Sequence, residues 1–318
     1  MDPVVVILSR GPQLYSTKRL VEEAEKLGWV VKVVDPLRIS GAGSSEEGLL
    51  YRSWPLECDA VIPRIGYSIT NKGCDKVLEF EKIGIIVMNS SQGIRSSRDK
   101  LIACQMMSSG NIPVPITVQV NSWEDTNRAI TRVGGTPCVV KATEGTHGAG
   151  VFLAQTEQHA KQLVYQMLER DMGPLVQEYI EESHGKDIRA LVVGGKVVAC
   201  MRRKAHGNEF RSNFHLGGSV EKIEISDEFE KIAIKAAKIL GLEVAGVDML
   251  ESKRGPLVLE VNSSPGLEGI EKASGINVAG AVTERMDYLL KELKQENIDS
   301  SIKEQGLNFD KTTGLSES

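Results

Sequence analysis

Apolar runs alternate with amphipathic stretches along the first ninety residues. Four continuous apolar runs predict buried strands, at residues 3–9, 29–34, 58–65 and 84–88. Between them, Leu20, Ala24 and Leu27 fall on one face of a predicted helix at 16–27, and another helix is expected from about 71. Strands that alternate with helices predict an α/β unit built on a parallel sheet.

The next eighty residues continue the alternation in a different order. Helical spacing and short apolar runs predict, in turn, a helix at 96–109, a helix at 123–133, strands at 136–142 and 151–154, a helix at 157–169 and a strand at 175–180. Ser96 and Asp99 form an S-x-x-D pattern that is typical of a helix N-terminus. We therefore expect the first of these helices to begin at Ser96.

A hairpin is predicted next, with strands at 186–193 and 196–203 joined by the loop 194–195. The loop is Gly-Gly, and two-residue loops of this kind favour a type I′ turn. Counting back from the turn pairs Asp187 with Arg202, so an ion pair between these two side chains is expected.

The C-terminal part of the chain contains two further periodic stretches. They predict helices at 227–240 and 276–293. From about Lys294 onward Gln, Asn, Ser, Glu and Lys dominate, and this composition predicts a disordered tail at 294–318.

A second hairpin, at 244–262, carries the clearest candidate chemistry. If its turn is centred on Arg254, Asp248 lies directly opposite Glu260, and Asn262 shares their face because strand side chains alternate. Two carboxylates and an amide oxygen are hard ligands that suit Mg²⁺ or Mn²⁺. The apolar neighbours predict an enclosed patch, in which two buried carboxylates need a cation. The alternative is a half-buried strand pair with a solvated acidic face.

Composition narrows the possible functions. The chain has 318 residues and a formal net charge of −5, which argues against a nucleic-acid-binding protein. No secretory signal and no membrane-length apolar stretch stand out. The five cysteines are scattered without a CxxC pair, so we expect reduced thiols in the cytoplasm and no zinc site.

Several motifs suit a negatively charged substrate. Lys141 ends a predicted strand just before the glycine-rich loop Glu144–Gly150, whose backbone could cradle phosphate oxygens. No GK[ST] follows the glycines, which disfavours a P-loop kinase. Arg64 follows a predicted strand, where it could hold a substrate carboxylate or simply pair locally. A basic cluster precedes the acidic hairpin, formed by Arg202, Arg203, Lys204 and Arg211.

Taken together, these motifs resemble the ATP-grasp ligases, and within them the RimK family of ribosomal protein S6 modification enzymes. The resemblance covers about residues 1–290 and rests on segments in order that include SSRDKL, VVKATEGTHGAGV, GKDIRALVVG, EFRSNFHLGG, VAGVDML and GPLVLEVNSSPGLEGIE. It implies an ATP-grasp fold in which two α+β subdomains clamp ATP. The expected division is an N-terminal pre-ATP-grasp domain at 1–95, a central lid at 96–178, a C-terminal subdomain at 179–293 and the tail.

The resemblance also implies roles for individual residues. Nucleotide contacts are expected from Lys100, Lys141, Glu178, Tyr179, Asp187, Arg211, Ser212 and Asn213, with Glu178 and Tyr179 at the adenine and Asp187 at the ribose. Arg203 and Arg211 are the expected catalytic charges. Two Mg²⁺ or Mn²⁺ ions are expected at Asp248, Glu260 and Asn262. Arg64 and Ser264 are expected to hold the substrate. Ser264 lies in the turn directly after the metal ligands.

The activity that the resemblance implies is ATP-dependent addition of glutamate to the C-terminus of ribosomal protein S6, through an acyl phosphate, with formation of poly-α-glutamate. The implied partners are glutamate and S6, without a membrane or direct nucleic-acid binding, and the implied assembly is a homotetramer. Two alternatives stay open at this point. One is a glutamate ligase that acts on a coenzyme or a carrier protein, and the other is a non-catalytic nucleotide sensor.

Overall fold

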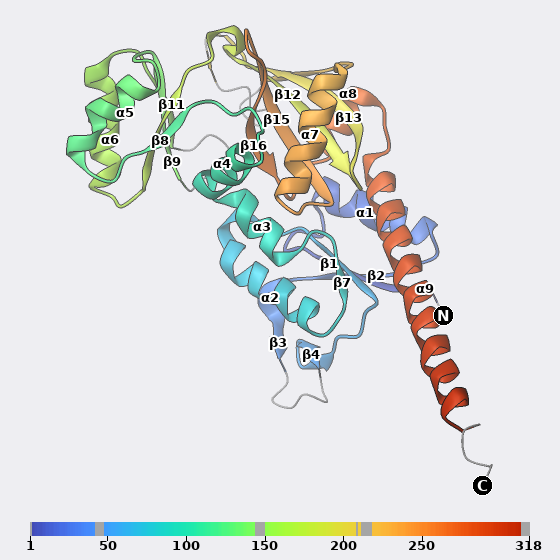
Figure 1. Ribbon diagram of the computed structural model, residues 1–318. Helices are drawn as coiled ribbons and strands as arrows, with labels where there is room; N and C mark the ends of the chain where they lie inside the picture. Colours follow the sequence, from blue (N-terminus) through green and yellow to red (C-terminus); the bar gives the residue numbers. More distant parts are fainter. Residues whose placement is uncertain (1, 42–47, 144–149, 208, 211–217, 313–318) are drawn as a thin grey trace.

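The computed structural model describes residues 2–41, 48–143, 150–207, 209–210 and 218–312, with side chains up to 296. Figure 1 shows three parts in chain order. An N-terminal α/β unit lies below, a small green lid projects to one side, and a larger sheet lies above; the long C-terminal helix runs down from the larger sheet beside the N-terminal unit. The predicted sequence of a parallel unit followed by mixed units is confirmed.

The N-terminal unit is the predicted parallel sheet, with strands in the order β2-β1-β6-β7. Its elements are β1 (Val4–Leu8), α1 (Tyr15–Lys26), β2 (Val30–Val34), β6 (Ala60–Pro63), α2 (Thr70–Lys82) and β7 (Ile86–Val87). A small sheet that the apolar pattern did not reveal is formed by β3 (Ile39–Gly41), β4 (Leu49–Tyr51) and β5 (Trp54–Pro55). Since β2 and β6 flank β1 on opposite sides, the strand order switches direction between β1 and β6, where open α/β sheets form ligand crevices.

The helix expected at 96–109 is wrong in its start and its continuity. Two helices occupy this region, α3 (Ser91–Arg98) and α4 (Lys100–Ser109). Asp99 separates them, because its carboxylate accepts from the N–H groups of Leu101 and Ile102 at 2.9 Å each and so caps the second helix. The acidic residue of the S-x-x-D pattern is therefore the N-cap itself.

The lid is a four-stranded antiparallel sheet in the order β10-β9-β11-β8, covered by two helices. Its elements are β8 (Thr117–Gln119), α5 (Thr126–Arg132), β9 (Cys138–Ala142), β10 (Val151–Ala154), α6 (Glu157–Leu168) and β11 (Pro174–Glu178). Buried aliphatic side chains of α5 and α6 pack against the sheet and give the lid a core of its own.

The third part is a five-stranded antiparallel sheet in the order β14-β13-β12-β15-β16. Its elements are β12 (Lys186–Val193), β13 (Lys196–Lys204), β14 (Ser219–Lys222), α7 (Asp227–Ile239), β15 (Val244–Ser252), β16 (Gly255–Asn262), α8 (Glu268–Ser274) and α9 (Val278–Thr312). Alternate side chains of β12 face opposite layers. Leu191 and Val193 join a core with α1 and α9, whereas Ala190 and Val192 join one with α4 and α7.

The expected disorder at 294–318 is wrong for residues 294–312, because α9 continues to Thr312. The polar composition was misleading. Glu, Gln and Lys are good helix formers, and the segment contains no proline. Within the described part of the chain, no helix combines the length and apolar character needed to cross a membrane.

Candidate active site

A β-bulge sets the register of the hairpin between β12 and β13. Gly194 and Gly195 both have positive φ, as a type I′ turn requires. The pairing shifts by one residue between Leu191 and Val192, however, so Asp187 lies opposite Arg203. The expected pairing of Asp187 with Arg202 is therefore wrong, because counting from the turn cannot detect a bulge.

The bulge brings Arg203 into a buried ionic chain. Arg203 Nε donates to Asp187 Oδ1 at 2.6 Å, and its Nη2 donates to Asp248 Oδ2 at 2.7 Å. Arg189 lies opposite Asp248 on β15 and makes a bidentate pair with it, at 2.6 and 2.7 Å. Sequence reasoning missed Arg189, although its position two residues after Asp187 places both on one face of β12.

The arginines of this ionic chain keep Asp248 ionised. Burial opposes ionisation of Asp248, which is 4% exposed, but the charges of Arg189 and Arg203 outweigh it and hold the pKa of that carboxyl below its usual value. Burial likewise disfavours the charge of Arg203, and the two aspartates raise the pKa of its guanidinium in spite of it. Asp248 and Arg203 are therefore both charged at pH 7.

The predicted pairing of Asp248 with Glu260 across the second hairpin is confirmed. The turn itself is centred between Lys253 and Arg254, and a bulge next to Glu260 makes up the difference. The expected enclosure is wrong, since Glu260 is exposed and only Asp248 is buried. The guanidinium groups of Arg189 and Arg203 pair with the Asp248 carboxylate.

The three expected metal ligands fit a hard divalent cation by their donor chemistry. Asp248 Oδ1 accepts one hydrogen bond, from Arg189, and Asn262 Oδ1 accepts one from the Ser264 N–H at 2.9 Å. Each of these oxygens has two lone pairs, so one on each is open with respect to the described residues. Glu260 forms no hydrogen bond or ion pair with any residue that the structure describes.

A pocket between α4, the lid sheet and β16 contains the two expected phosphate-binding lysines. Lys100, Lys141, Gln177 and Glu260 are among its lining residues. Lys141 is 7% exposed, and its Nζ donates to Gln177 Oε1 at 3.1 Å. Burial, together with the neighbouring charge of Lys100, lowers the pKa of Lys141 to about 8. Gln177, which sequence reasoning missed, donates in turn to Thr117 Oγ1 at 2.6 Å.

The expected adenine contacts, Glu178 and Tyr179, lie at the end of β11 where the lid meets the larger sheet. The Glu178 carboxylate accepts from the Ile116 N–H at 2.8 Å and pairs with Arg254. Tyr179 shares a hydrogen bond with His184. Both side chains are thus engaged within the protein, and the Glu178 N–H donates to the Ile116 carbonyl at 2.9 Å.

Several expected site residues lie outside the described residues. These are most of the glycine-rich loop, 144–149, and the nucleotide and catalytic candidates Arg211, Ser212 and Asn213. Among the described candidates, Lys100, Lys141 and Glu260 line one pocket, and Asp187, Arg203 and Asp248 belong to one buried ionic chain.

The two expected substrate residues meet at the turn that follows β16. Arg64 extends from the end of β6, and its Nη2 donates to the Pro265 carbonyl at 2.7 Å. Asn89 Nδ2 donates to the Ser263 carbonyl at 2.8 Å, and the Leu267 N–H donates to Ser16 Oγ at 3.0 Å. Residues 263–267, which we call the substrate turn, are thus held by the N-terminal domain at three points.

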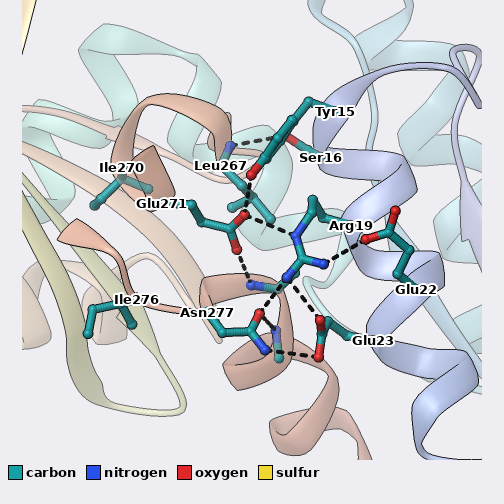
Figure 2. Close-up of polar contacts among 12 residues, drawn as sticks. Tyr15, Ser16, Arg19, Glu22, Glu23, Leu267, Ile270, Glu271, Ile276 and Asn277 are labelled. Atoms are coloured by element: carbon teal, nitrogen blue, oxygen red, sulfur yellow. Dashed lines mark hydrogen bonds and ion pairs between the residues drawn. The ribbon is translucent and has the colours of Figure 1, made fainter. Parts of the chain in front are cut away.

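A polar network fixes the helix after the substrate turn to the same domain (Figure 2). Glu271 of α8 accepts from Tyr15 Oη at 2.8 Å and from Arg19 Nε at 3.2 Å. Arg19 also donates to Glu23 at 2.9 Å and to Asn277 at 2.8 Å. Hydrogen bonds from Lys26 and Asn277 lower the pKa of Glu23 to about 2. Sequence reasoning missed this network.

The three-part architecture, with a pocket between the lid and the larger sheet, is that of the ATP-grasp fold, and solved structures of ATP-grasp ligases show the same fold. A complex of the ATP-grasp ligase PsnB superimposes with a TM-score of 0.70 at 20% identity, over 91% of this chain and 98% of that one. The D-alanine–D-alanine ligase of Bacillus anthracis gives a TM-score of 0.68 at 16% identity, over 93% and 100%.

Sequence comparison is more specific. Residues 4–94 match the RimK PreATP-grasp domain and residues 97–286 match the RimK-like ATP-grasp domain. A probable alpha-L-glutamate ligase of Aeromonas salmonicida is 51% identical over 285 residues, which are 89% of this chain and 96% of the relative. A protein of the same name from Halorhodospira halophila is 48% identical over 282 residues, 88% and 93% of the two chains. The chain belongs to the RimK family of ATP-grasp ligases.

Proposed function

We propose that this protein is a glutamate ligase that uses ATP to join a carboxylate to the amine of glutamate. The observation that carries the proposal is the pocket in which Lys100 and Lys141 meet Glu260 across two subdomains. Two lysines and the Glu260 carboxylate, which no described residue pairs with, suit a nucleoside triphosphate with its divalent cation. The relatives named alpha-L-glutamate ligases support glutamate as the amino acid.

In the proposed reaction the acceptor carboxylate attacks the γ-phosphorus of ATP, the bond to the bridging oxygen breaks, and ADP leaves. The amine of glutamate then attacks the acyl carbon and displaces phosphate, so an amide forms. Lys141 and Lys100 hold phosphate oxygens, and the lid excludes water from the acyl phosphate. A bound Mg²⁺ or Mn²⁺ at Asp248, Glu260 and Asn262 supplies charge neutralisation for the phosphates.

The buried ionic chain of two arginines and two aspartates fixes the guanidinium of Arg203 in this site. Arg203 is held by Asp187 and Asp248, so its guanidinium cannot turn away as negative charge develops. Arg189 orients Asp248 through both carboxylate oxygens. Arg211, Ser212 and Asn213 complete the nucleotide site in this proposal. Asp187 is proposed at the ribose, in addition to its pair with Arg203.

The acceptor that we propose is the C-terminal glutamate of ribosomal protein S6, with repeated addition giving poly-α-glutamate. The family supports this acceptor, and the substrate turn directly after Asn262 is a suitable place for the end of a chain. A coenzyme or a carrier protein is the alternative acceptor within the same chemistry.

The test is to incubate the protein with ATP, Mg²⁺ and glutamate, with and without S6, and to follow ADP and the product masses. We expect S6 to gain masses of glutamyl residues, and Glu260→Ala to release no ADP. Glu251→Gln is the matched control, because Glu251 lies on the same hairpin but pairs with Arg202. Ligation by Glu260→Ala at the wild-type rate would remove Glu260 from the site, and ADP release without any glutamylated product would refute the ligase.

A further inference from the structure

Two arginines beside the substrate turn have no carboxylate partner among the described residues. Arg64 donates to the Pro265 carbonyl, and Arg98 of α3 donates to the carbonyls of Ile65 and Gly66 and to Thr70 Oγ1. Burial and the charge of Arg98 lower the pKa of Arg64 to about 10. A cation in such surroundings is unfavourable unless an anion accompanies it, so this corner carries positive charge that nothing described here neutralises.

The substrate turn also contains two hydroxyl groups without partners. Ser263 Oγ and Ser264 Oγ are buried, and neither forms a hydrogen bond within the described part of the chain. A buried hydroxyl that makes no hydrogen bond costs about 1–3 kcal/mol. Arg64 contacts the carbonyl of Pro265, the next residue in the turn. The hydroxyls of Ser263 and Ser264 and the guanidinium of Arg64 therefore all belong to the surroundings of one short turn.

The position of this corner in the fold is that of a ligand crevice. Arg64 follows β6, and its N–H donates to the Leu8 carbonyl at the end of β1 at 2.9 Å. The strand order changes direction between these two strands, and open α/β sheets bind ligands at the carboxyl ends of strands at such a point. Asn89 contacts the substrate turn itself, and the network around Glu271 in Figure 2 fixes the helix that follows it.

We infer that Arg64, Ser263 and Ser264 form a subsite for a carboxylate of the incoming glutamate. This carboxylate is bound but is not the one that ATP activates. The inference rests on the proposed function and extends it, because it separates the carboxylate that is held from the carboxylate that reacts. A guanidinium matches a carboxylate in charge and in its paired donors, and the two hydroxyls add donors to the same anion. A neutral amide would leave the charge of Arg64 and Arg98 uncompensated.

The serines provide a test that a purely structural role would not pass. Ser263→Ala and Ser264→Ala remove hydroxyls that have no partner in the described structure, so we expect Tm to stay the same or rise. We expect the KM for glutamate to rise about tenfold, with the Kd for ATP unchanged. Thr126→Val is the matched control, because Thr126 Oγ1 is an equally isolated buried hydroxyl on the lid. An unchanged KM in both serine variants would overturn the subsite.

Substrate analogues test the guanidinium and identify the carboxylate. Wild-type protein and Arg64→Gln are compared with glutamate, with 4-aminobutyrate, which lacks the α-carboxylate, and with 2-aminobutyrate, which lacks the γ-carboxylate. We expect the wild-type preference for glutamate over one analogue to fall about ten- to a hundredfold in Arg64→Gln. The analogue concerned identifies the carboxylate that is bound.

The outcomes separate this subsite from the proposed function itself. If wild-type protein forms an amide with glutamate but Arg64→Gln keeps every preference, the subsite is wrong and the ligase stands. If wild-type protein forms no amide with any amino acid, both the subsite and the proposed function are overturned. Arg95→Ala serves as a control for loss of an arginine in the same domain, since Arg95 pairs with Asp75 on the surface.

Discussion

Lys141 gives the proposed nucleotide site a property that can be measured directly. Its ammonium group is buried, and the pKa is about 8 instead of the ordinary 10.5. That difference corresponds to about 3 kcal/mol against the charged form. At pH 8 about half of the unliganded molecules therefore carry a neutral Lys141. If this lysine binds a phosphate of ATP, the phosphate charge restores the proton.

Binding of a non-hydrolysable ATP analogue should accordingly take up about half a proton at pH 8 and less than about 0.2 at pH 7. Titration calorimetry in buffers of different ionisation enthalpy measures this uptake. The Kd should weaken about tenfold between pH 7 and pH 9, because the binding form of Lys141 disappears. Lys141→Arg keeps the positive charge but does not titrate in this range. Proton uptake by this variant should therefore come from other groups alone and be smaller than in wild-type protein.

The same argument predicts an opposite effect on stability. Between pH 8 and 10.5 the unfolded chain binds more protons than the folded one at this position, so the free energy of unfolding should rise with pH. Lys141→Met should remove that rise and stabilise the protein at pH 7 by up to about 3 kcal/mol, while ATP affinity falls sharply. Equal proton uptake by wild-type protein and Lys141→Arg at pH 8 would refute the phosphate contact.

Three further predictions concern the charged networks. Arg189→Gln leaves Asp248 with one guanidinium fewer, and we expect denaturant unfolding to show a loss of about 3–5 kcal/mol together with a lower rate of ADP release. Glu23 has its pKa lowered to about 2, so its contribution should be lost as pH falls from about 4.5 to 2; Glu23→Gln should flatten this part of the stability curve, measured by thermal unfolding. Tyr15→Phe removes one donor to Glu271 and should raise the KM for glutamate more than the KM for ATP in steady-state kinetics.

The sequence allowed prediction of the features that depend on local periodicity. The parallel sheet follows from alternating strands and helices, and the opposition of Asp248 and Glu260 follows from residue spacing. Register beyond a bulge does not follow from spacing, because one extra residue moves every later side chain to the other face. This is why Arg203, not Arg202, faces Asp187. The exposure of Glu260 could not be predicted either, because it depends on the arrangement of whole subdomains.

Contacts between distant segments could not be predicted from a single sequence. Tyr15 and Glu271 are 256 residues apart in the chain, and no local pattern links them. Their pairing follows only once α1 and α8 meet at the edge of the N-terminal domain. Arg189 differs from these residues, because it shares a strand face with Asp187 and a search for paired charges on that face would have found it.

The N-terminal domain therefore has a specific place in the proposed reaction. The expected nucleotide and metal residues in the described chain come from the other two parts, whereas the substrate turn is held by Ser16, Arg64 and Asn89 of this domain. A displacement of about 1 Å in a reacting group can cost on the order of a hundredfold in rate. In the proposed reaction, these contacts fix the glutamate carboxylate relative to the N-terminal domain, while the nucleotide is held by residues of the other two parts.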